Sequence, residues 1–122
     1  MKILVGYDSS NAAREAKAFN AHVLLLTSLP GGTVTETIEI QYAKDDLEDA
    51  KKVLESKGIS CETHLLIRWL KPGEDIVRFA EENNVDEIII GVRRRSKVGK
   101  ILFGSNAQYV VINAHCPVVS VK

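Results

Sequence analysis

Five short apolar runs alternate with stretches of helical character, and this alternation constrains the fold more than any other feature of the sequence. The runs are apolar throughout instead of alternating in polarity, which is typical of parallel strands covered on both faces. They comprise residues 3–6, 23–26, 61–67, 88–90 and 117–121. The pattern predicts one α/β domain over residues 1–122, with a doubly wound, five-stranded parallel sheet in the middle of three layers.

The connections between these runs differ in how clearly they predict helices. Residues 11–20 are rich in alanine, but only residues 9–21 separate Asp8 from His22, so the first helix must be short. Residues 33–41 fit both a strand and the first turns of a helix, and this alternative stays open. A clear helical pattern runs from about Tyr42, with Leu47, Ala50, Val53 and Leu54 on its inner stripe, and Gly58 suits the position after its end.

The last two helices carry local start signals. Pro72 suits the first position of a helix, Glu74 and Asp75 favour its first turn, and Asn83–Asn84 end it. Ser105 and Gln108 have the spacing of a capping box, with Ser105 as the N-cap. The residues expected to face inwards from this last helix are Ala107, Val110, Val111 and Ala114.

The stretch from Glu87 to Ser105 joins an apolar strand to a basic loop and then to a helix start. Five of the chain's 16 basic residues lie in that loop without an acidic residue among them: Arg93, Arg94, Arg95, Lys97 and Lys100. Lys+Arg and Asp+Glu both number 16, so no global field attracts nucleic acid or an anionic membrane. A glycine turn between a strand and a helix N-terminus is typical of phosphate sites, because backbone N–H groups and the helix dipole both favour an anion there.

Several other functions are disfavoured by the same sequence. It contains no Gly-x-Gly-x-x-Gly, and Gly99-Lys100 lacks the glycine and the Ser or Thr of a P-loop, because Arg94 and Ile101 occupy those positions. The three histidines share no ligand-like spacing, and no serine has a glycine elbow. Cys61 and Cys116 form no Cys-x-x-Cys pair, so we expect two small buried thiols in a reducing cytoplasm. No apolar run approaches the length of a membrane span, and no signal-peptide layout is present.

Three motifs together resemble the universal stress protein family. They are Val-Gly-Tyr-Asp-Ser-Ser at residues 5–10, Gly91-x-x-Arg94 followed after nine residues by Gly104-Ser105, and Ala-His-Cys-Pro-Val at residues 114–118. Pro-Gly-Glu-Asp-Ile at residues 72–76 extends the resemblance, which covers essentially the whole chain. The resemblance implies the fold of the adenine nucleotide alpha hydrolase-like proteins, with strand order 3-2-1-4-5.

The resemblance also implies a ligand, ATP or AMP, in the crevice at the carboxyl ends of strands 1 and 4. Asp8 is expected to contact the ribose, or Mg²⁺ carried by the nucleotide, and Thr27 is expected to line the base pocket. The phosphate would lie near Gly91, Arg94 and the helix N-terminus. The full set of expected cofactor-binding residues is Tyr7, Asp8, Thr27, Gly91, Val92, Arg94, Gly104, Ser105 and Asn106.

Two departures from the family pattern leave alternatives open. Nucleotide-binding members have glycine where this chain has Arg94. A side chain there either blocks the close approach of phosphate or grips phosphate oxygens with its guanidinium. The first helix is shorter than the family norm by roughly two turns. That shortening is expected either to expose part of one sheet face or to remodel one wall of the crevice.

These observations predict a cytoplasmic stress-response or regulatory domain that binds an adenine nucleotide and has no efficient catalysis of its own. Slow hydrolysis of ATP stays open. The alternative is a non-nucleotide-binding interaction module of the same fold, acting through its dimer surface. The strand from Pro117 to Val121 would lie at the sheet edge and join two copies into a homodimer. Nucleic-acid binding is disfavoured because no aromatic residues are interleaved with the loop arginines.

Overall fold

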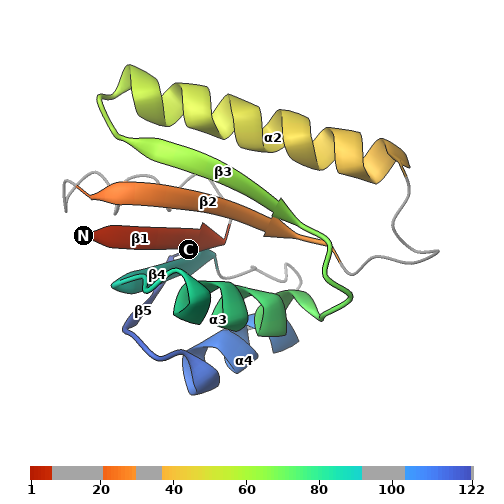
Figure 1. Cartoon of the computed structure of the whole chain (residues 1–122), viewed down its shortest axis with the longest axis vertical. Helices are drawn as coiled ribbons and strands as arrows, with labels where there is room; N and C mark the ends of the chain where they lie inside the picture. Colours follow the sequence, from red (N-terminus) through yellow and green to blue (C-terminus); the bar gives the residue numbers. More distant parts are fainter. Residues whose placement is uncertain (7–20, 30–36, 92–103, 122) are drawn as a thin grey trace, which may run out of the picture.

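The fold is an open α/β sheet with helices on both faces (Figure 1). The computed structural model describes residues 1–6, 21–29, 37–91 and 104–121. Within these residues the elements are β1 (Lys2–Gly6), β2 (His22–Ser28), α2 (Thr37–Ser56), β3 (Cys61–Leu66), α3 (Pro72–Glu82), β4 (Glu87–Gly91), α4 (Ser105–Asn113) and β5 (Val118–Val121). The expected helix over residues 11–20 lies outside the described residues.

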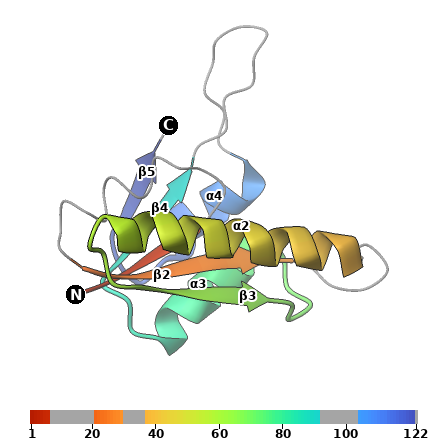
Figure 2. The ribbon, with the colours of Figure 1, turned by 90° about the horizontal axis from the view of Figure 1, so that it is seen from above.

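All five strands are parallel, and their order is β3-β2-β1-β4-β5. This order confirms the doubly wound sheet. α2 lies on one face against β3 and β2, and α3 and α4 lie side by side on the other face (Figures 1 and 2). The view in Figure 2 shows α2 crossing in front of β2 and β3, with α3 behind the sheet.

The sheet face on the α2 side carries the first hydrophobic cluster. Leu47 and Leu54 of α2 are 3% and 1% exposed and pack with strand residues of this face. Those strand residues are at most 2% exposed and include Ile3, Val5, Val23, Leu25 and Ile89. These positions on the α2 side of the sheet are therefore covered. The first helix, whose shortening was expected to expose part of one sheet face or to remodel the crevice, lies outside the described residues.

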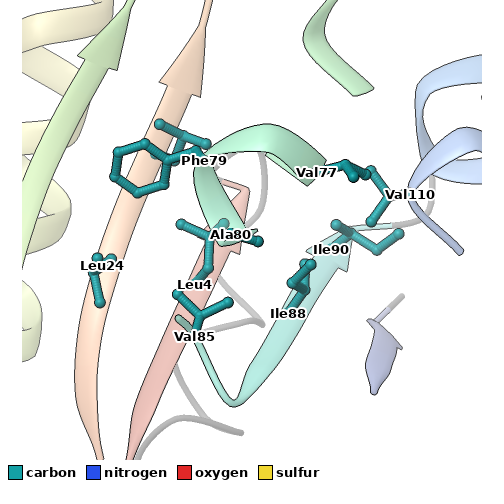
Figure 3. Packing of buried hydrophobic residues seen from close by; sticks show 10 residues of the cluster. Leu4, Leu24, Val77, Phe79, Ala80, Val85, Ile88, Ile90 and Val110 are labelled. Carbon is teal, nitrogen blue, oxygen red and sulfur yellow. The ribbon is translucent and has the colours of Figure 1, made fainter. Parts of the chain in front are cut away.

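The second cluster lies between the sheet and the helices α3 and α4 (Figure 3). Val77, Phe79 and Ala80 of α3 and Val110 of α4 meet strand residues that include Leu4, Leu24, Ile88 and Ile90 (Figure 3). Full burial of one such aliphatic side chain contributes roughly 1.5–3 kcal/mol. Alternate residues of a strand enter opposite clusters. Strands between two such clusters must therefore be apolar at consecutive positions.

Left-handed residues end α2 and α3 in the same way. Gly58 has φ 77° and Asn84 has φ 50°, as the position after a helix end requires. The N–H groups of Ile59 and Val85 then donate to the carbonyl oxygens of Leu54 and Ala80, five residues back. Both ends are Schellman motifs, which confirms the predicted helix ends.

The structure decides one open alternative and corrects two inner positions. α2 begins at Thr37, so the described part of the segment that fitted both a strand and a helix is helical. Val53 of α2 and Val111 of α4 were expected to face inwards, but they are 50% and 49% exposed. In each helix the remaining inner positions already fill the space against the sheet, so these two residues lie at the margin of the buried stripe.

Candidate functional site

The carboxyl ends of the parallel strands lie along one edge of the sheet, and α3 and α4 both begin at that edge. Gly6, the last residue of β1, is paired with Leu26 of β2 and with Ile90 of β4. The sheet is built outwards in both directions from β1 and β4, so this edge contains the topological switch point of the fold. Ligands of open α/β sheets bind beyond the strand ends at such a point.

The N-termini of α3 and α4 touch each other beside this point. The backbone N–H of Gly73, in the first turn of α3, donates to the side-chain oxygen of Asn106 of α4 at 2.9 Å. A Cβ atom on Gly73 would lie 2.8 Å from the backbone oxygen of Asn106, so only glycine permits this approach. Two positive helix ends are thereby held together, and both favour an anion nearby.

Gly104 is the N-cap residue of α4, with φ −66° and ψ 162°. Its carbonyl oxygen accepts the first helical hydrogen bond, from the N–H of Gln108 at 3.0 Å. A Cβ atom added to Gly104 would meet no atom of the described residues within 4 Å. The first N–H groups of a helix have no partner within it, and such groups favour an anion.

The predicted capping box is therefore wrong. Ser105 is the first helical residue instead of the N-cap, and the cap position is taken by Gly104, which has no side chain. The backbone is already extended at Gly104, which takes the cap position one residue earlier than the Ser-x-x-Gln pattern indicated. The Ser105 side chain is exposed at the open end of the helix, which suits the ligand contact predicted for it.

The other predicted site residues fall into two groups. Gly91 is the last residue of β4 and is paired with Val121, and Thr27 is half-buried near the end of β2. The alternation of β2 puts Thr27 on the same sheet face as Leu25, which packs with α2. Tyr7, Asp8, Val92 and Arg94 lie outside the described residues. The structure thus brings together Gly104, Ser105 and Asn106 at one helix end.

Asn106 has a role that sequence reasoning missed. Its side-chain oxygen accepts the Gly73 N–H, so it caps the neighbouring helix α3 instead of its own helix. The cap residue of α3 itself, Lys71, makes no side-chain cap hydrogen bond. The Pro-Gly pair opening α3 was the available signal, because a glycine in a first helical turn indicates close approach by another segment.

A buried ionic cluster beside the same edge was also missed. Asp75 of α3 is 0% exposed, and its carboxylate accepts hydrogen bonds from Ser28 Oγ at 2.7 Å and from Arg68 Nε at 2.6 Å. Arg68 also donates from Nη1 to Glu82 Oε1 at 2.6 Å. These contacts tie the end of β2 and the β3–α3 connection to both ends of α3. A buried charge of this kind is tolerated because it is paired and fully hydrogen-bonded.

The protonation of Arg68 is fixed by the same contacts. Burial opposes its charge, but the hydrogen bonds to Glu82 and Asp75 outweigh burial and raise the pKa of the Arg68 guanidinium above its ordinary value. The Arg68 guanidinium therefore keeps its charge over the whole physiological range. Its role in the described structure is to fix the geometry of the edge.

Two kinds of site are not found in the described part of the chain. No group of three or more His, Cys, Asp or Glu residues there is placed to hold a metal ion. No helix in residues 37–91 or 104–121 combines the length and apolar character needed to cross a membrane.

Comparison with known proteins agrees with this fold. A universal stress protein of Methanocaldococcus jannaschii is 31% identical over 99% of this chain and 81% of its own length. The structure of a universal stress protein from Archaeoglobus fulgidus is 39% identical, with a TM-score of 0.88 over 100% of this chain and 98% of that chain. A structure of the universal stress protein from Archaeoglobus fulgidus in complex with dAMP is 36% identical, with a TM-score of 0.83 over 100% of this chain and 98% of that chain. The profile of the universal stress protein family matches residues 1–122, and the chain belongs to that family.

Proposed function

We propose that this chain binds an adenine nucleotide, ATP or AMP, at the carboxyl edge of the sheet. The observation that carries the proposal is the N-terminus of α4, where no atom of the described residues lies within 4 Å of a Cβ added to Gly104 and the first-turn N–H groups favour an anion. The 36%-identical relative from Archaeoglobus fulgidus was solved in complex with dAMP, which is itself an adenine nucleotide. Its likeness to this chain over 100% of the sequence supports the same class of ligand here.

In this proposal the phosphate lies against Gly104, Ser105 and the backbone N–H of Asn106. The opposite wall of the phosphate site is formed by Gly91, Val92 and Arg94. The ribose and the base are contacted by Tyr7, Asp8 and Thr27. Mg²⁺ would arrive bound to the nucleotide, with Asp8 as its contact on the protein. The Asn106 side chain already caps α3 and so holds the starts of α3 and α4 together. Its backbone N–H is the group that donates a hydrogen bond to the phosphate. No residue is assigned a catalytic role.

The biological setting proposed is a cytoplasmic stress-response or regulatory role. Cys61 and Cys116 are both free and partly buried, which suits a reducing compartment. Nucleotide occupancy would be the signal that such a domain reports.

The test is calorimetric titration with ATP and Mg²⁺, comparing the wild type with Gly104→Val. The φ of −66° at Gly104 suits valine and no atom of the described residues obstructs it, so the variant should fold and melt like the wild type. Its side chain occupies the phosphate space, so affinity for ATP should fall by about tenfold or more, as for the loss of one charge-assisted hydrogen bond. The affinity for adenosine, which lacks phosphate, should fall much less.

The second candidate function is a dimeric interaction module that binds no nucleotide. An exposed apolar surface favours it: Val111 and Ile112 of α4 are 49% and 78% exposed, and β5 is an edge strand of the sheet. A homodimer joined along β5, from Pro117 to Val121, would cover that edge. If millimolar ATP gives no heat of binding and no change in melting temperature, the second function is favoured over the first.

A further inference from the structure

Trp69, in the connection between β3 and α3, combines two unusual properties. It is the only tryptophan of the chain, and it is 75% exposed. Its φ is 61°, in the left-handed region that bulky side chains rarely adopt. Such strain persists only where the neighbouring structure imposes it, and it concentrates at functional sites. A large aromatic side chain is thus held away from the core in an unfavourable conformation.

The residues on both sides of Trp69 impose this conformation. Arg68 is fixed by Asp75, which is 0% exposed, and by Glu82. On the other side, the carbonyl oxygen of Lys71 accepts the N–H of Asp75 at 3.0 Å and so starts α3. The connection is anchored to α3 at two points that enclose Trp69, and the indole is presented from a fixed backbone.

Trp69 also lies at the same edge of the sheet as the proposed nucleotide site. The end of β3 is bonded to the end of β2 through the N–H of Leu29 and the carbonyl oxygen of Leu66, at 2.9 Å. Four residues further along the chain from Trp69, Gly73 is hydrogen-bonded to Asn106 beside the open end of α4. Four residues span at most about 14 Å, which is comparable to the length of a nucleotide from its phosphates to its base.

The apolar surface at Trp69 suits a single planar ring better than a protein. Its exposed apolar neighbour in the same connection, Ile67, is only 37% exposed. A stable protein interface needs about 800 Å² from each partner, far more than one indole and part of one isoleucine offer. One face of an indole matches the area of a purine base, and stacking of a base on an aromatic ring tolerates an open, solvated setting.

We propose that Trp69 is the base-stacking residue of the nucleotide site, packing its indole against the adenine of a ligand whose phosphate lies at the N-terminus of α4. This inference rests on the proposed nucleotide-binding function and deepens it. The strain at φ 61° then serves to hold the ring outside the core, where the base can reach it. Thr27 would close the base pocket from the β2 side.

The single tryptophan makes the inference directly testable by fluorescence. The intact chain is titrated with AMP, with ATP and, as probes without a base, with ribose 5-phosphate and pyrophosphate. AMP and ATP should quench or shift the emission of Trp69 with the same midpoint that calorimetry gives for binding. The probes without a base should leave the emission unchanged even where they bind.

Three variants separate stacking from structural effects. Trp69→Ala should lower the affinity for AMP at least about 5-fold, the lower end of the range for one stacked base. Trp69→Phe should lower this affinity less. The affinity for pyrophosphate should be the same in all variants. Trp69→Gly should bind AMP as weakly as Trp69→Ala but melt at a higher temperature than Trp69→Ala, because glycine accepts a φ of 61° without strain.

The outcomes distinguish this inference from the function on which it rests. If AMP and ATP bind the wild type but Trp69→Ala binds them equally well and the emission does not respond, the stacking role is wrong and the nucleotide site stands. If the wild type binds no nucleotide by calorimetry, the proposed function fails, and the stacking role fails with it. If a protein partner changes the Trp69 emission and AMP does not, the stacking role is wrong and Trp69 belongs to an interaction surface.

Discussion

Cys61 and Cys116 show how position in the fold sets the chemistry of a single residue. Both thiols are partly buried at the margins of the two hydrophobic clusters. Burial raises the pKa of each thiol above its ordinary value, and nearby carboxylates add to the effect: Glu55 for Cys61, and Glu87 and Asp86 for Cys116. The thiolate is the nucleophilic form, so a raised pKa makes both residues poor nucleophiles at neutral pH.

We therefore expect both cysteines to react with iodoacetamide at pH 8 more slowly than the same thiols in the chain unfolded by urea. The rate should keep rising as the pH passes above 9, because the thiolate fraction grows only near the raised pKa. Mass spectrometry of peptides from a time course measures each site separately. A cysteine that reacts as fast in the folded chain as in urea would contradict this assignment.

Asp75 shows what residue-level sequence reasoning misses. Its position in the first turn of α3 correctly indicated a favourable interaction with the helix dipole. No sequence pattern indicated that this carboxylate would be 0% exposed and bonded to Ser28 and Arg68, because those partners come from β2 and from the β3–α3 connection. Such a set of contacts depends on tertiary packing, which no local pattern contains.

At the scale of whole elements, the contact between α3 and α4 includes one hydrogen bond made by a single side chain, that of Asn106. Asn106→Ala removes the acceptor for the Gly73 N–H and leaves that donor unpaired in the first turn of α3. Loss of a capping interaction of this kind lowers the free energy of unfolding by about 0.5–2 kcal/mol. Asn106→Asp keeps the acceptor and adds a negative charge at two helix N-termini, so it should be at least as stable as the wild type. Urea denaturation measures both changes.

Asn113→Ala is the matched control, because Asn113 lies at the other end of α4 and bonds only the carbonyl oxygen of Tyr109 in its own helix among the bonds described. Alanine improves helix propensity there, so stability should change little or rise. If Asn106→Ala is no less stable than Asn113→Ala, the bond to Gly73 is not a cap for α3.

The helices also show where sequence patterns succeed and fail. Gly58 and Asn84 were correctly predicted to end α2 and α3, because a left-handed residue after a helix is a local requirement. The start of α4 was misplaced by one residue, since Gly104 and Ser105 both suit an N-cap and only the backbone conformation decides between them. Helix ends are predictable when a single residue type satisfies the geometry.

At the scale of the whole molecule, the parallel sheet and its helices were predicted from continuous apolar runs, because both faces of each central strand must be buried. The strand order came from the family resemblance, since the runs themselves do not say which strands are neighbours. The site was predicted only in part. Gly104, Ser105 and Asn106 share one helix end as expected, whereas the capping role of Asn106 and the position of Trp69 depend on contacts between segments distant in sequence.

The whole molecule is expected to form a homodimer through β5. The carbonyl oxygen of Pro117 accepts the N–H of Ile88, so the backbone groups of Val119 also point to β4 and those of Ser120 point outwards. Ser120→Pro removes one outward donor and leaves the bonds to β4 in place. Light scattering at tens of micromolar should give twice the chain mass of 13.5 kDa for the wild type and a smaller mass for the variant.

Thermal melting of Ser120→Pro provides the control, since a folded monomer shows that the edge and not the domain was disrupted. A wild-type mass of one chain at that concentration would end the dimer hypothesis. If the variant remains fully dimeric, the dimer contact lies on a surface other than β5. The exposed Val111 and Ile112 of α4 are then the next residues to test.

The hydrogen bond between Gly73 and Asn106 has a consequence for how sequences of this kind can diverge. It pins the start of α4 to α3, while β4 is held by β1 and β5, so both ends of the segment between Gly91 and Gly104 are fixed by other parts of the chain. Substitutions from Val92 to Phe103 are therefore expected to leave these two anchored ends in place. Arginine at position 94, where the family resemblance implies glycine in nucleotide-binding members, lies in this segment.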